Sequence, residues 1–431
     1  MNALFALTIL AWATTPPQPA SAVRSRLDAA AVFLRMGQPA EALGALEQAR
    51  RDEPDNPWID FYQGQAEQQL GHPYRAIDAY DRAVKTLDDL NHPDPQLERT
   101  IHARRRIARR QIFSFTQQIG LAYDTNVTFL GGGASDLNLI ANAPDGLFSN
   151  DTTVTWSPVA DGDSLLTFGL RTGQSWHADI DSFDFQDYGG SIHYIRRLGQ
   201  RWRVEAGYDY DITYLGNEPY LSNHALTSAV QYVWPTTSGP VRPTTSALGY
   251  RLEGRDFLFA TTPAFDQDGV VNAAAFRQMF SVQPIPRFDW TWDVGLGYEF
   301  ASIATEGTEF DRLTNSFGVD LDVPLVNPAD ATQYLILPDR ELRFHFGANW
   351  LLADFRKPSE IDRRNRHRRD LITTLSFAVS QKLITDPKLG DVTLSGLIQW
   401  TIADSNVVTD RHAVPFSYDK IVYGLNLQWS F

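Results

Sequence analysis

From residue 112 to residue 431, apolar and polar side chains alternate along the chain with a period of two. The last segment carries its apolar side chains on one face, at Ile421, Tyr423, Leu425, Leu427, Trp429 and Phe431. Such alternation predicts β-strands with one apolar and one polar face. The runs are about ten to fifteen residues long. They exceed the usual soluble strand of about five or six residues and are long enough for a tilted crossing of a bilayer.

Turn residues divide this region into fourteen predicted strands. They cover residues 112–128, 149–158, 163–177, 185–198, 201–215, 222–234, 244–258, 267–281, 288–303, 309–323, 339–353, 366–382, 390–403 and 417–431. Twelve or sixteen strands are alternatives, because strand ends read from a pattern shift by several residues. A soluble sandwich would also alternate, but nine of the eleven Trp residues fall in this region, as the aromatic girdles of a membrane barrel require. The pattern therefore predicts an antiparallel transmembrane β-barrel over residues 112–431.

Before this region, residues 23–111 follow a helical period. Small and apolar positions recur after thirty-four residues: Ala30, Gly37, Ala42, Leu46 and Ala49 correspond to Gly64, Gly71, Ala76, Tyr80 and Ala83. Thirty-four residues is the period of the tetratricopeptide repeat. The small residues would let paired helices approach closely, and the glycines at 37 and 71 would open the turns. The segment resembles about two such repeats; an alanine-rich helical hairpin is the alternative.

A third helical element is predicted over residues 93–111, as the cap that stacked repeats need. It is rich in arginine, at Arg99, Arg104, Arg105, Arg106, Arg109 and Arg110. These side chains would form either a solvated face or a surface that pairs with lipid phosphates.

The chain begins with an apolar stretch at residues 3–13, followed by a Pro-rich stretch and the small residues Ala20, Ser21 and Ala22. This order predicts a signal peptide over residues 1–22, although no Lys or Arg precedes the apolar stretch. No other apolar stretch is long enough for a membrane helix. We therefore expect an α plus all-β chain: a signal peptide, a small periplasmic helical domain at residues 23–111 and an outer-membrane barrel of about fourteen strands at residues 112–431.

The composition limits the chemistry. The chain has no cysteine, which excludes disulfides, thiolate catalysis and Cys-ligated zinc. Its nine His residues show no metal-ligand spacing, and Ser405, Asp410 and His412 match a catalytic triad by residue type only. A formal charge of −14, together with the export signal, argues against nucleic-acid binding. We therefore expect no enzyme activity, no cofactor, no metal and no nucleic-acid partner.

Acidic side chains follow the polar face of several predicted strands. These candidate lumen acids are Glu205, Asp209, Asp211, Asp293, Glu299, Asp320 and Asp322. An acidic lumen would favour cationic or polar solutes. In the alternative, the acids pair with inward basic residues and stiffen the barrel; the candidate partners are Arg171, Arg203, Arg343 and Lys420.

The densest basic cluster of the sequence lies in a predicted outer connection. Its arginines are Arg363, Arg364, Arg366, Arg368 and Arg369. Lipopolysaccharide phosphate is the expected ligand, because guanidinium groups form forked hydrogen bonds with phosphate. Ordinary pairing with Glu360, Asp362 and Asp370 is the alternative.

Three short motifs stand in order along the predicted barrel: residues 121–127 (LAYDTNV), residues 368–370 (RRD) and residues 404–407 (DSNV). Together with the helical repeats and the terminal Phe431, they resemble the surface lipoprotein assembly modifier family. The resemblance implies a periplasmic tetratricopeptide domain joined to a fourteen-stranded barrel that delivers lipoproteins to the cell surface. The family-like positions are Asp124, Asn126, Asp370, Ser405 and Asn406.

The expected partners follow from this architecture. They are outer-membrane lipid and lipopolysaccharide, the barrel-assembly machinery, which would read Phe431 as an assembly signal, and a polypeptide or lipoprotein cargo on the helical domain. The chain departs from the family in its small helical domain and its long, Gly-rich first outer loop. An exopolysaccharide-export porin and a diffusion porin are the alternatives; the first usually carries many more repeats, and the second needs no helical domain.

Overall fold

The computed structural model describes residues 21–89, 94–128, 143–235, 239–259, 263, 266–284, 291–325, 342–360, 362, 364–386, 390–407 and 416–431. The predicted signal peptide lies outside these ranges except for its last two residues, which begin the first described helix. The described chain divides into a helical unit and a barrel unit, and each is considered by itself.

Five helices form the described helical unit. They are α2 (Ser21–Arg35), α3 (Pro39–Asp52), α4 (Pro57–Gln69), α5 (Pro73–Asp88) and α6 (Pro95–Arg110). Proline opens each of α3 to α6, where a missing N–H costs no helical hydrogen bond. Gly37 and Gly71 adopt φ values of 71° and 80° in the turns after α2 and α4, as predicted. None of the described helices is both long and apolar enough to cross a membrane.

Small residues let these helices pack closely. Ala30, Ala42 and Ala76 are fully buried. A Cβ atom on Gly64 of α4 would collide with the ring of Tyr80 in α5, so glycine permits this approach. Burial raises the pKa of Tyr80 above its ordinary value, and its hydroxyl donates to Oε1 of Gln68 over 3.1 Å. The thirty-four-residue pattern thus corresponds to the contact faces of two helical hairpins, α2–α3 and α4–α5.

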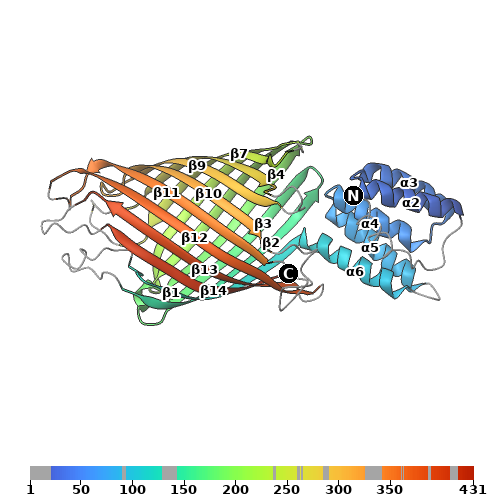
Figure 1. The fold of residues 1–431 in the computed structure, drawn as a ribbon, viewed down its shortest axis with the longest axis horizontal. Coiled ribbons are helices and arrows are strands. Elements are labelled where there is room, and N and C mark those ends of the chain that lie inside the picture. The colour runs from blue at the N-terminus through green and yellow to red at the C-terminus, as the bar shows by residue number, and fades with distance from the viewer. Residues whose placement is uncertain are drawn as a thin grey trace. The chain divides into compact units, whose positions relative to one another are not determined.

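Fourteen antiparallel strands follow and close into a barrel in which β1 pairs with β14 (Figure 1). They are β1 (Phe113–Asp124), β2 (Asp145–Asp161), β3 (Ser164–His177), β4 (Phe185–Leu198), β5 (Trp202–Leu215), β6 (Glu218–Val233), β7 (Val241–Phe257), β8 (Gly269–Val282), β9 (Trp292–Thr305), β10 (Arg312–Pro324), β11 (Leu342–Pro358), β12 (His367–Asp386), β13 (Gly390–Ser405) and β14 (Tyr418–Ser430). The predicted fold class, helices followed by a barrel of fourteen strands, is confirmed.

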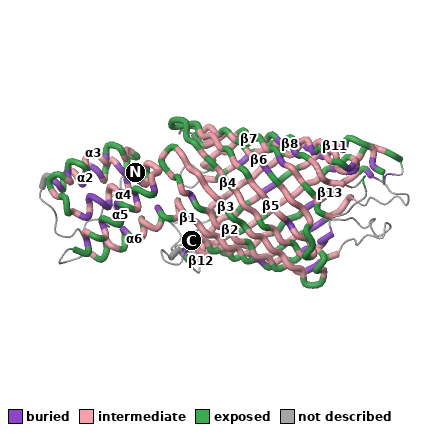
Figure 2. Tube along the Cα trace, turned by 180° about the vertical axis from the view of Figure 1, so that it is seen from behind, coloured by how far each residue is buried: buried purple, intermediate pink, exposed green. Residues whose placement is uncertain are grey.

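The outer face of the barrel is apolar. Leu121, Leu170, Leu248 and Leu425, from four strands, are 64%, 67%, 61% and 59% exposed. Since alternate residues of a strand point to opposite faces, the polar positions between them line the lumen. In Figure 2 the strands are mostly intermediate or exposed, as expected of a single-layered wall. An apolar band around a polar interior is the arrangement of a membrane-spanning barrel.

The seam between β1 and β14 is held by nine residue pairs, from Thr116–Ser430 to Asp124–Val422. On its outer face, the rings of Phe115 and Trp429 meet edge to face with centroids 5.3 Å apart. Tyr123 and Tyr423 lie directly opposite each other, with ring centroids 5.6 Å apart. An aromatic pair therefore lies toward each end of the seam.

Several strands run beyond their predicted ends. β2 starts at Asp145 rather than at residue 149, and β11 continues to Pro358 rather than ending at residue 353. The carboxylate of Asp145 accepts hydrogen bonds from the backbone N–H groups of Gly146, Asp179 and Ile180, which fixes the start of β2. Strand ends read from an alternating pattern commonly shift by several residues. β9 starts at Trp292 rather than at residue 288; residues 285–290 lie outside the described ranges.

Candidate functional site

The seven predicted lumen acids occupy inner-face positions, and each lies 2.6 to 3.9 Å from a basic nitrogen. Glu205 and Asp209 contact His193, Asp211 contacts Arg171, Asp293 and Asp322 contact Arg343, Glu299 contacts Arg251, and Asp320 contacts Arg277. The sequence singled out Arg171 and Arg343 as partners but not His193, Arg251 or Arg277. The wall of the lumen thus carries both signs of charge.

The balance of charge varies around the wall. On β3 to β5, two basic side chains serve four carboxylates: Arg171 lies 3.0 Å from Asp187 and 2.8 Å from Asp211, and His193 lies 3.2 Å from Glu205 and 3.0 Å from Asp209. The four carboxylates thus outnumber the two bases that contact them, whereas Arg197 of β4 and Arg203 of β5, which lie opposite each other nearer the turn between these strands, add positive charge to the sector.

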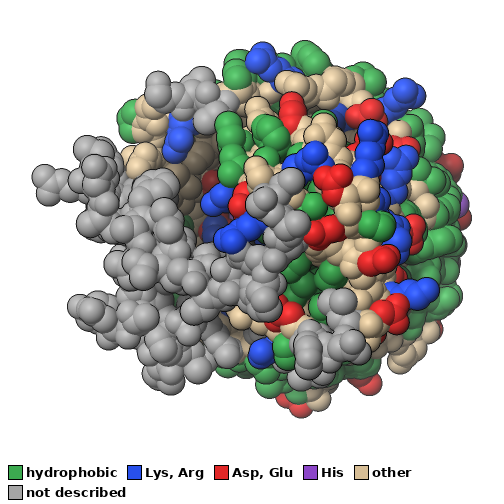
Figure 3. All heavy atoms as spheres, turned by 90° about the vertical axis from the view of Figure 1, so that its right-hand side faces the viewer, with side chains coloured by type: hydrophobic (Ala, Val, Ile, Leu, Met, Phe, Trp, Pro, Cys, Tyr) green, Lys and Arg blue, Asp and Glu red, His purple; other side chains and the backbone are tan. Residues whose placement is uncertain are grey.

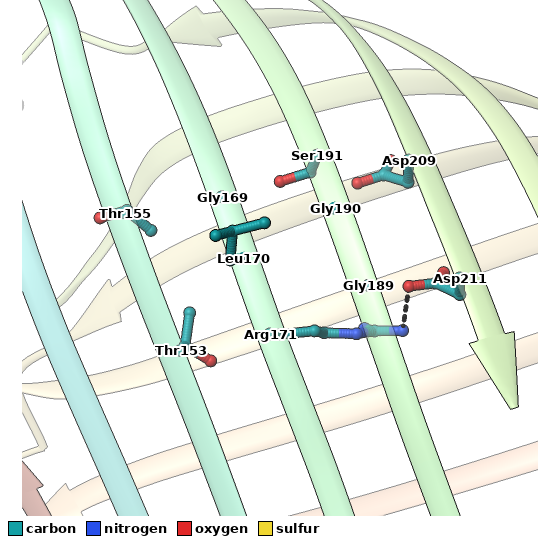
Figure 4. Close-up of a pocket in the computed structure, with 10 residues that line it drawn as sticks. All are labelled: Thr153, Thr155, Gly169, Leu170, Arg171, Gly189, Gly190, Ser191, Asp209 and Asp211. Atoms are coloured by element: carbon teal, nitrogen blue, oxygen red, sulfur yellow. Dashed lines mark hydrogen bonds and ion pairs between the residues drawn. The ribbon is translucent and has the colours of Figure 1, made fainter. Parts of the chain in front are cut away.

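A cavity of about 200 Å³ opens in the same sector, against β2 to β5 (Figure 4). Its polar side chains are Thr153 and Thr155 of β2, Arg171 of β3, Ser191 of β4, and Asp209 and Asp211 of β5. Glycines form its floor: a Cβ atom on Gly189 would collide with the carboxylate of Asp211, and one on Gly169 would collide with the hydroxyl of Ser191. The sequence pointed to the two aspartates. It did not point to the hydroxyls or glycines, because their meeting depends on strand register.

Family-like residues gather at one end of the barrel, where β1 and β13 end and β12 and β14 begin. We call this end the distal rim. Asp124 and Lys420 form a buried ion pair there, with Oδ2 and Nζ 2.7 Å apart. Oδ1 of Asp124 accepts the backbone N–H of Asn126 over 2.9 Å, and Asn126 is almost fully buried. Asp124 thus fixes the turn after β1 and binds the neighbouring strand β14.

Asn406 joins the end of β13 to the start of β12. Its side chain accepts the backbone N–H of Arg369 over 2.7 Å and donates to the carbonyl of His367 over 2.9 Å. Its carbonyl also accepts a hydrogen bond from the guanidinium of Arg366. Asn406 therefore organises the backbone at this point of the rim.

Three arginines of the predicted basic loop are paired with acids: Arg366 with Asp362 over 3.1 Å, Arg368 with Asp370 over 2.6 Å, and Arg369 with Asp354. Arg368 also lies against two rings, with its guanidinium carbon 4.4 Å from the centroid of Phe355 and 3.6 Å from that of Phe416. Arg364 is exposed, and Arg363 lies outside the described residues. Most of the described cluster is therefore engaged within the protein.

The sequence did not point to two buried acids at the same rim. Glu309 and Glu253 are each 3% exposed. Glu309 accepts the hydroxyl of Ser359 over 2.9 Å and the backbone N–H of Glu360, and so joins the β9–β10 connection to the β11–β12 connection. Glu253 lies between two arginines of its own strand, β7. A single glutamate among other polar residues does not change the hydrophobic period, so the sequence pattern does not predict that it is buried.

The candidate catalytic residues near the end of β13 are described only in part. The backbone N–H of Ser405 donates to the hydroxyl of Ser417 over 2.8 Å, while Asp410 and His412 lie outside the described residues. Within the described ranges, no group of three His, Asp or Glu side chains has a metal-binding arrangement.

In Figure 3, acidic and basic side chains are interspersed over the face in view.

No protein-family model and no curated protein matches the chain. Among solved structures, a bacterial polysaccharide outer membrane secretin aligns at 8% identity and a TM-score of 0.38, over 73% of this chain and 98% of that one. A BenF-like porin from Pseudomonas fluorescens Pf-5 aligns at 7% identity and a TM-score of 0.36, over 74% of this chain and 99% of that one. CdiB from Acinetobacter baumannii aligns at 9% identity and a TM-score of 0.34, over 74% of this chain and 60% of that one. Sequence identities and TM-scores this low assign the chain to no family and to no activity.

The apolar outer band, the closed wall of fourteen strands and the polar lumen are together the properties of a barrel that spans a bacterial outer membrane. The chain is an outer-membrane-type β-barrel protein with a helical unit before its first strand.

Proposed function

We propose that this protein exports polypeptides, lipoproteins among them, to the surface of a Gram-negative cell. The helical unit lies in the periplasm and binds an extended segment of the cargo, and the barrel provides the route across the outer membrane. One observation carries the proposal: two helical hairpins and a third helical element precede a closed barrel in one chain. A barrel that serves only for diffusion has no use for such a unit.

The helical unit offers a polar surface suited to a peptide. Arg50 and Arg82 both donate to Oδ1 of Asp60, over 2.8 and 3.1 Å, and both donate to Oε1 of Gln63. Asp60 is buried, while the two arginine side chains are 35% and 47% exposed. The buried acid therefore orients two guanidinium groups that keep donors for carbonyl or carboxylate oxygens of a bound chain.

Membrane partners follow from the same proposal. Phe431 ends the closing strand and serves as the assembly signal. The exposed arginines Arg364 and Arg369 face lipopolysaccharide phosphate, although Arg369 shares its charge with Asp354. The proposal involves no covalent step and no cofactor.

The test is a surface-display assay. A surface-exposed lipoprotein of the same cell is tagged, and its exposure on intact cells is measured by protease digestion and antibody labelling. Arg50→Gln with Arg82→Gln should reduce display several-fold while the level of barrel in the membrane is unchanged. Arg51→Gln is the matched control, because Arg51 pairs only loosely with Glu47 on the exposed face of the same helix. Unchanged display in a strain that lacks the whole protein would refute the proposal.

Polysaccharide export is a second candidate, favoured by the hydroxyl-lined cavity of the inner wall. It predicts that loss of the protein depletes extracellular polysaccharide and leaves lipoprotein display intact. The two assays on one deletion strain therefore separate the candidates.

A further inference from the structure

We infer that the cavity on β2 to β5 is a binding subsite for one amino-sugar unit, that is, a small polyhydroxylated ring with a protonated amine. The inference rests on the barrel having an aqueous lumen, which both proposed functions share, and it does not depend on the cargo. Nothing in the sequence alone indicated such a subsite.

The size of the cavity selects a small ligand. Pockets that enclose drug-sized molecules have volumes of roughly 300–1,000 Å³, whereas this one has about 200 Å³. The glycines at 169 and 189 keep it hollow, since a Cβ atom on either would meet side chains of the neighbouring strand. The wall therefore receives a single ring or one unit of a longer chain.

The lining selects hydroxyl groups. Thr153, Thr155 and Ser191 each present a hydroxyl that both donates and accepts. Thr153 and Thr155 belong to β2 and Ser191 belongs to β4, and β3 lies between these strands, so the hydroxyls lie on two sides of Arg171. The Arg171 guanidinium is fixed between Asp187 and Asp211, over 3.0 and 2.8 Å. A ring carrying several hydroxyls satisfies donors and acceptors spread in this way, and an apolar ring does not.

The charge of the lining selects a cation among such rings. Two carboxylates, those of Asp209 and Asp211, line the cavity together with one base, Arg171. A protonated amine near these two acids gains an attraction that a neutral sugar lacks, whereas a sugar acid is repelled. The expected order of affinity is therefore amino sugar, then neutral sugar, then sugar acid.

The test is calorimetric titration of the full-length protein in a detergent without a sugar headgroup. The probes are glucosamine, glucose, glucuronate and cyclohexylamine, which has a ring and a charge but no hydroxyl. Glucosamine should bind at least about tenfold more tightly than glucose, equivalent to about 1.4 kcal/mol, and cyclohexylamine should bind more weakly than glucosamine. Equal binding of cyclohexylamine and glucosamine, or no binding of any probe, overturns the inference.

Variants locate the site. Gly189→Ala should remove glucosamine binding, whereas Gly297→Ala, on the inner face of β9 with open space around its Cβ position, should keep it. Asp209→Asn changes charge with little change in volume and should bring glucosamine affinity down to that of glucose. Loss of binding in Gly297→Ala as large as in Gly189→Ala would place the ligand elsewhere. Lipoprotein display measured on the same variants shows whether the subsite and the export function fail separately.

Discussion

The backbone N–H of Phe431 donates to the carbonyl of Phe115 over 2.8 Å, and the N–H of Phe115 donates to the carbonyl of Phe431 over 3.1 Å. The last residue of the chain is thus bonded to the start of the first strand, at the end of the seam that closes the barrel.

Deletion of Phe431 should therefore lower the amount of assembled barrel, because it removes both hydrogen bonds and the terminal ring. The heat-dependent gel mobility of the protein in outer-membrane fractions measures assembly. Phe431→Tyr should assemble normally, and Phe431→Gly, which keeps both backbone bonds, isolates the role of the ring. Normal assembly of the deletion variant would contradict this reading of the seam.

Removal of only one partner of the Asp124–Lys420 ion pair should strongly lower the stability of the barrel. Both side chains are less than a tenth exposed, so Lys420→Met leaves a buried carboxylate without its cation. Loss of one partner of a buried pair costs about 3–5 kcal/mol, and denaturant unfolding of the barrel in detergent should show a decrease of this order. The double variant Asp124→Leu with Lys420→Met should recover much of it, since no buried charge is left. A double variant that is less stable than Lys420→Met would rule out this account.

Gly64 should tolerate no side chain. Gly64→Ala places a Cβ atom against the ring of Tyr80, and overpacking of this kind costs about 1–3 kcal/mol. Gly44→Ala in α3 is the control: nothing lies within 4 Å of its Cβ position, so it should stabilise the helix by about 0.5–1 kcal/mol. Urea unfolding followed by the helical circular dichroism signal compares the two. The prediction fails if both substitutions shift the transition in the same direction.

The helical unit should lose stability in alkali. Burial raises the pKa of Tyr80 above the ordinary tyrosine value, which is about 10. The folded state favours the neutral phenol of Tyr80. Its contribution to the stability of the helical unit is therefore complete below about pH 10 and is lost as the pH rises through the folded-state pKa. Tyr80→Phe should reduce the fall in helical stability between about pH 8 and about pH 11. Tyr74→Phe, at an exposed position of α5, should leave it unchanged.

The buried Glu309 should protect the β11–β12 connection from proteolysis. Glu309→Ala removes the acceptor of Ser359 and Glu360, and trypsin should then cleave faster after the exposed Arg364. Glu306→Ala, in the same β9–β10 connection, is the control. Equal cleavage rates in the two variants would show that Glu309 does not hold this connection.

The strands were predictable from the sequence because the outer face of every strand has the same lipid environment. Every strand must present apolar side chains to lipid, so the two-residue period of Leu121 or Leu425 recurs around the whole barrel. The same two-residue period predicted that the side chains of all seven lumen acids lie on the inner face. The small residues of the helical unit were predictable for a similar reason, since close helix contacts at Ala30 and Gly64 leave no room for larger ones.

The partners of these residues were not predictable, because they depend on register. Arg277 meets Asp320 across two strand boundaries, and His193 meets both Glu205 and Asp209 only because Gly207 lies opposite it. The cavity on β2 to β5 is a further case, since its hydroxyls and glycines come from separate strands. Glu309 joins two connections that are about fifty residues apart in the sequence. No hydrophobic period in the sequence predicts such a contact.

The aromatic pair of Tyr123 and Tyr423 distinguishes the observed alignment of the β1–β14 seam from shifted ones. A shift of one residue would turn the apolar face of β14 into the lumen. A shift of two residues would keep every side chain on its proper face, so burial alone would not penalise it. A shift of two residues in either direction would move Tyr123 away from Tyr423, its direct partner across the seam. The two tyrosine rings therefore favour the observed register of the seam over a register displaced by two residues.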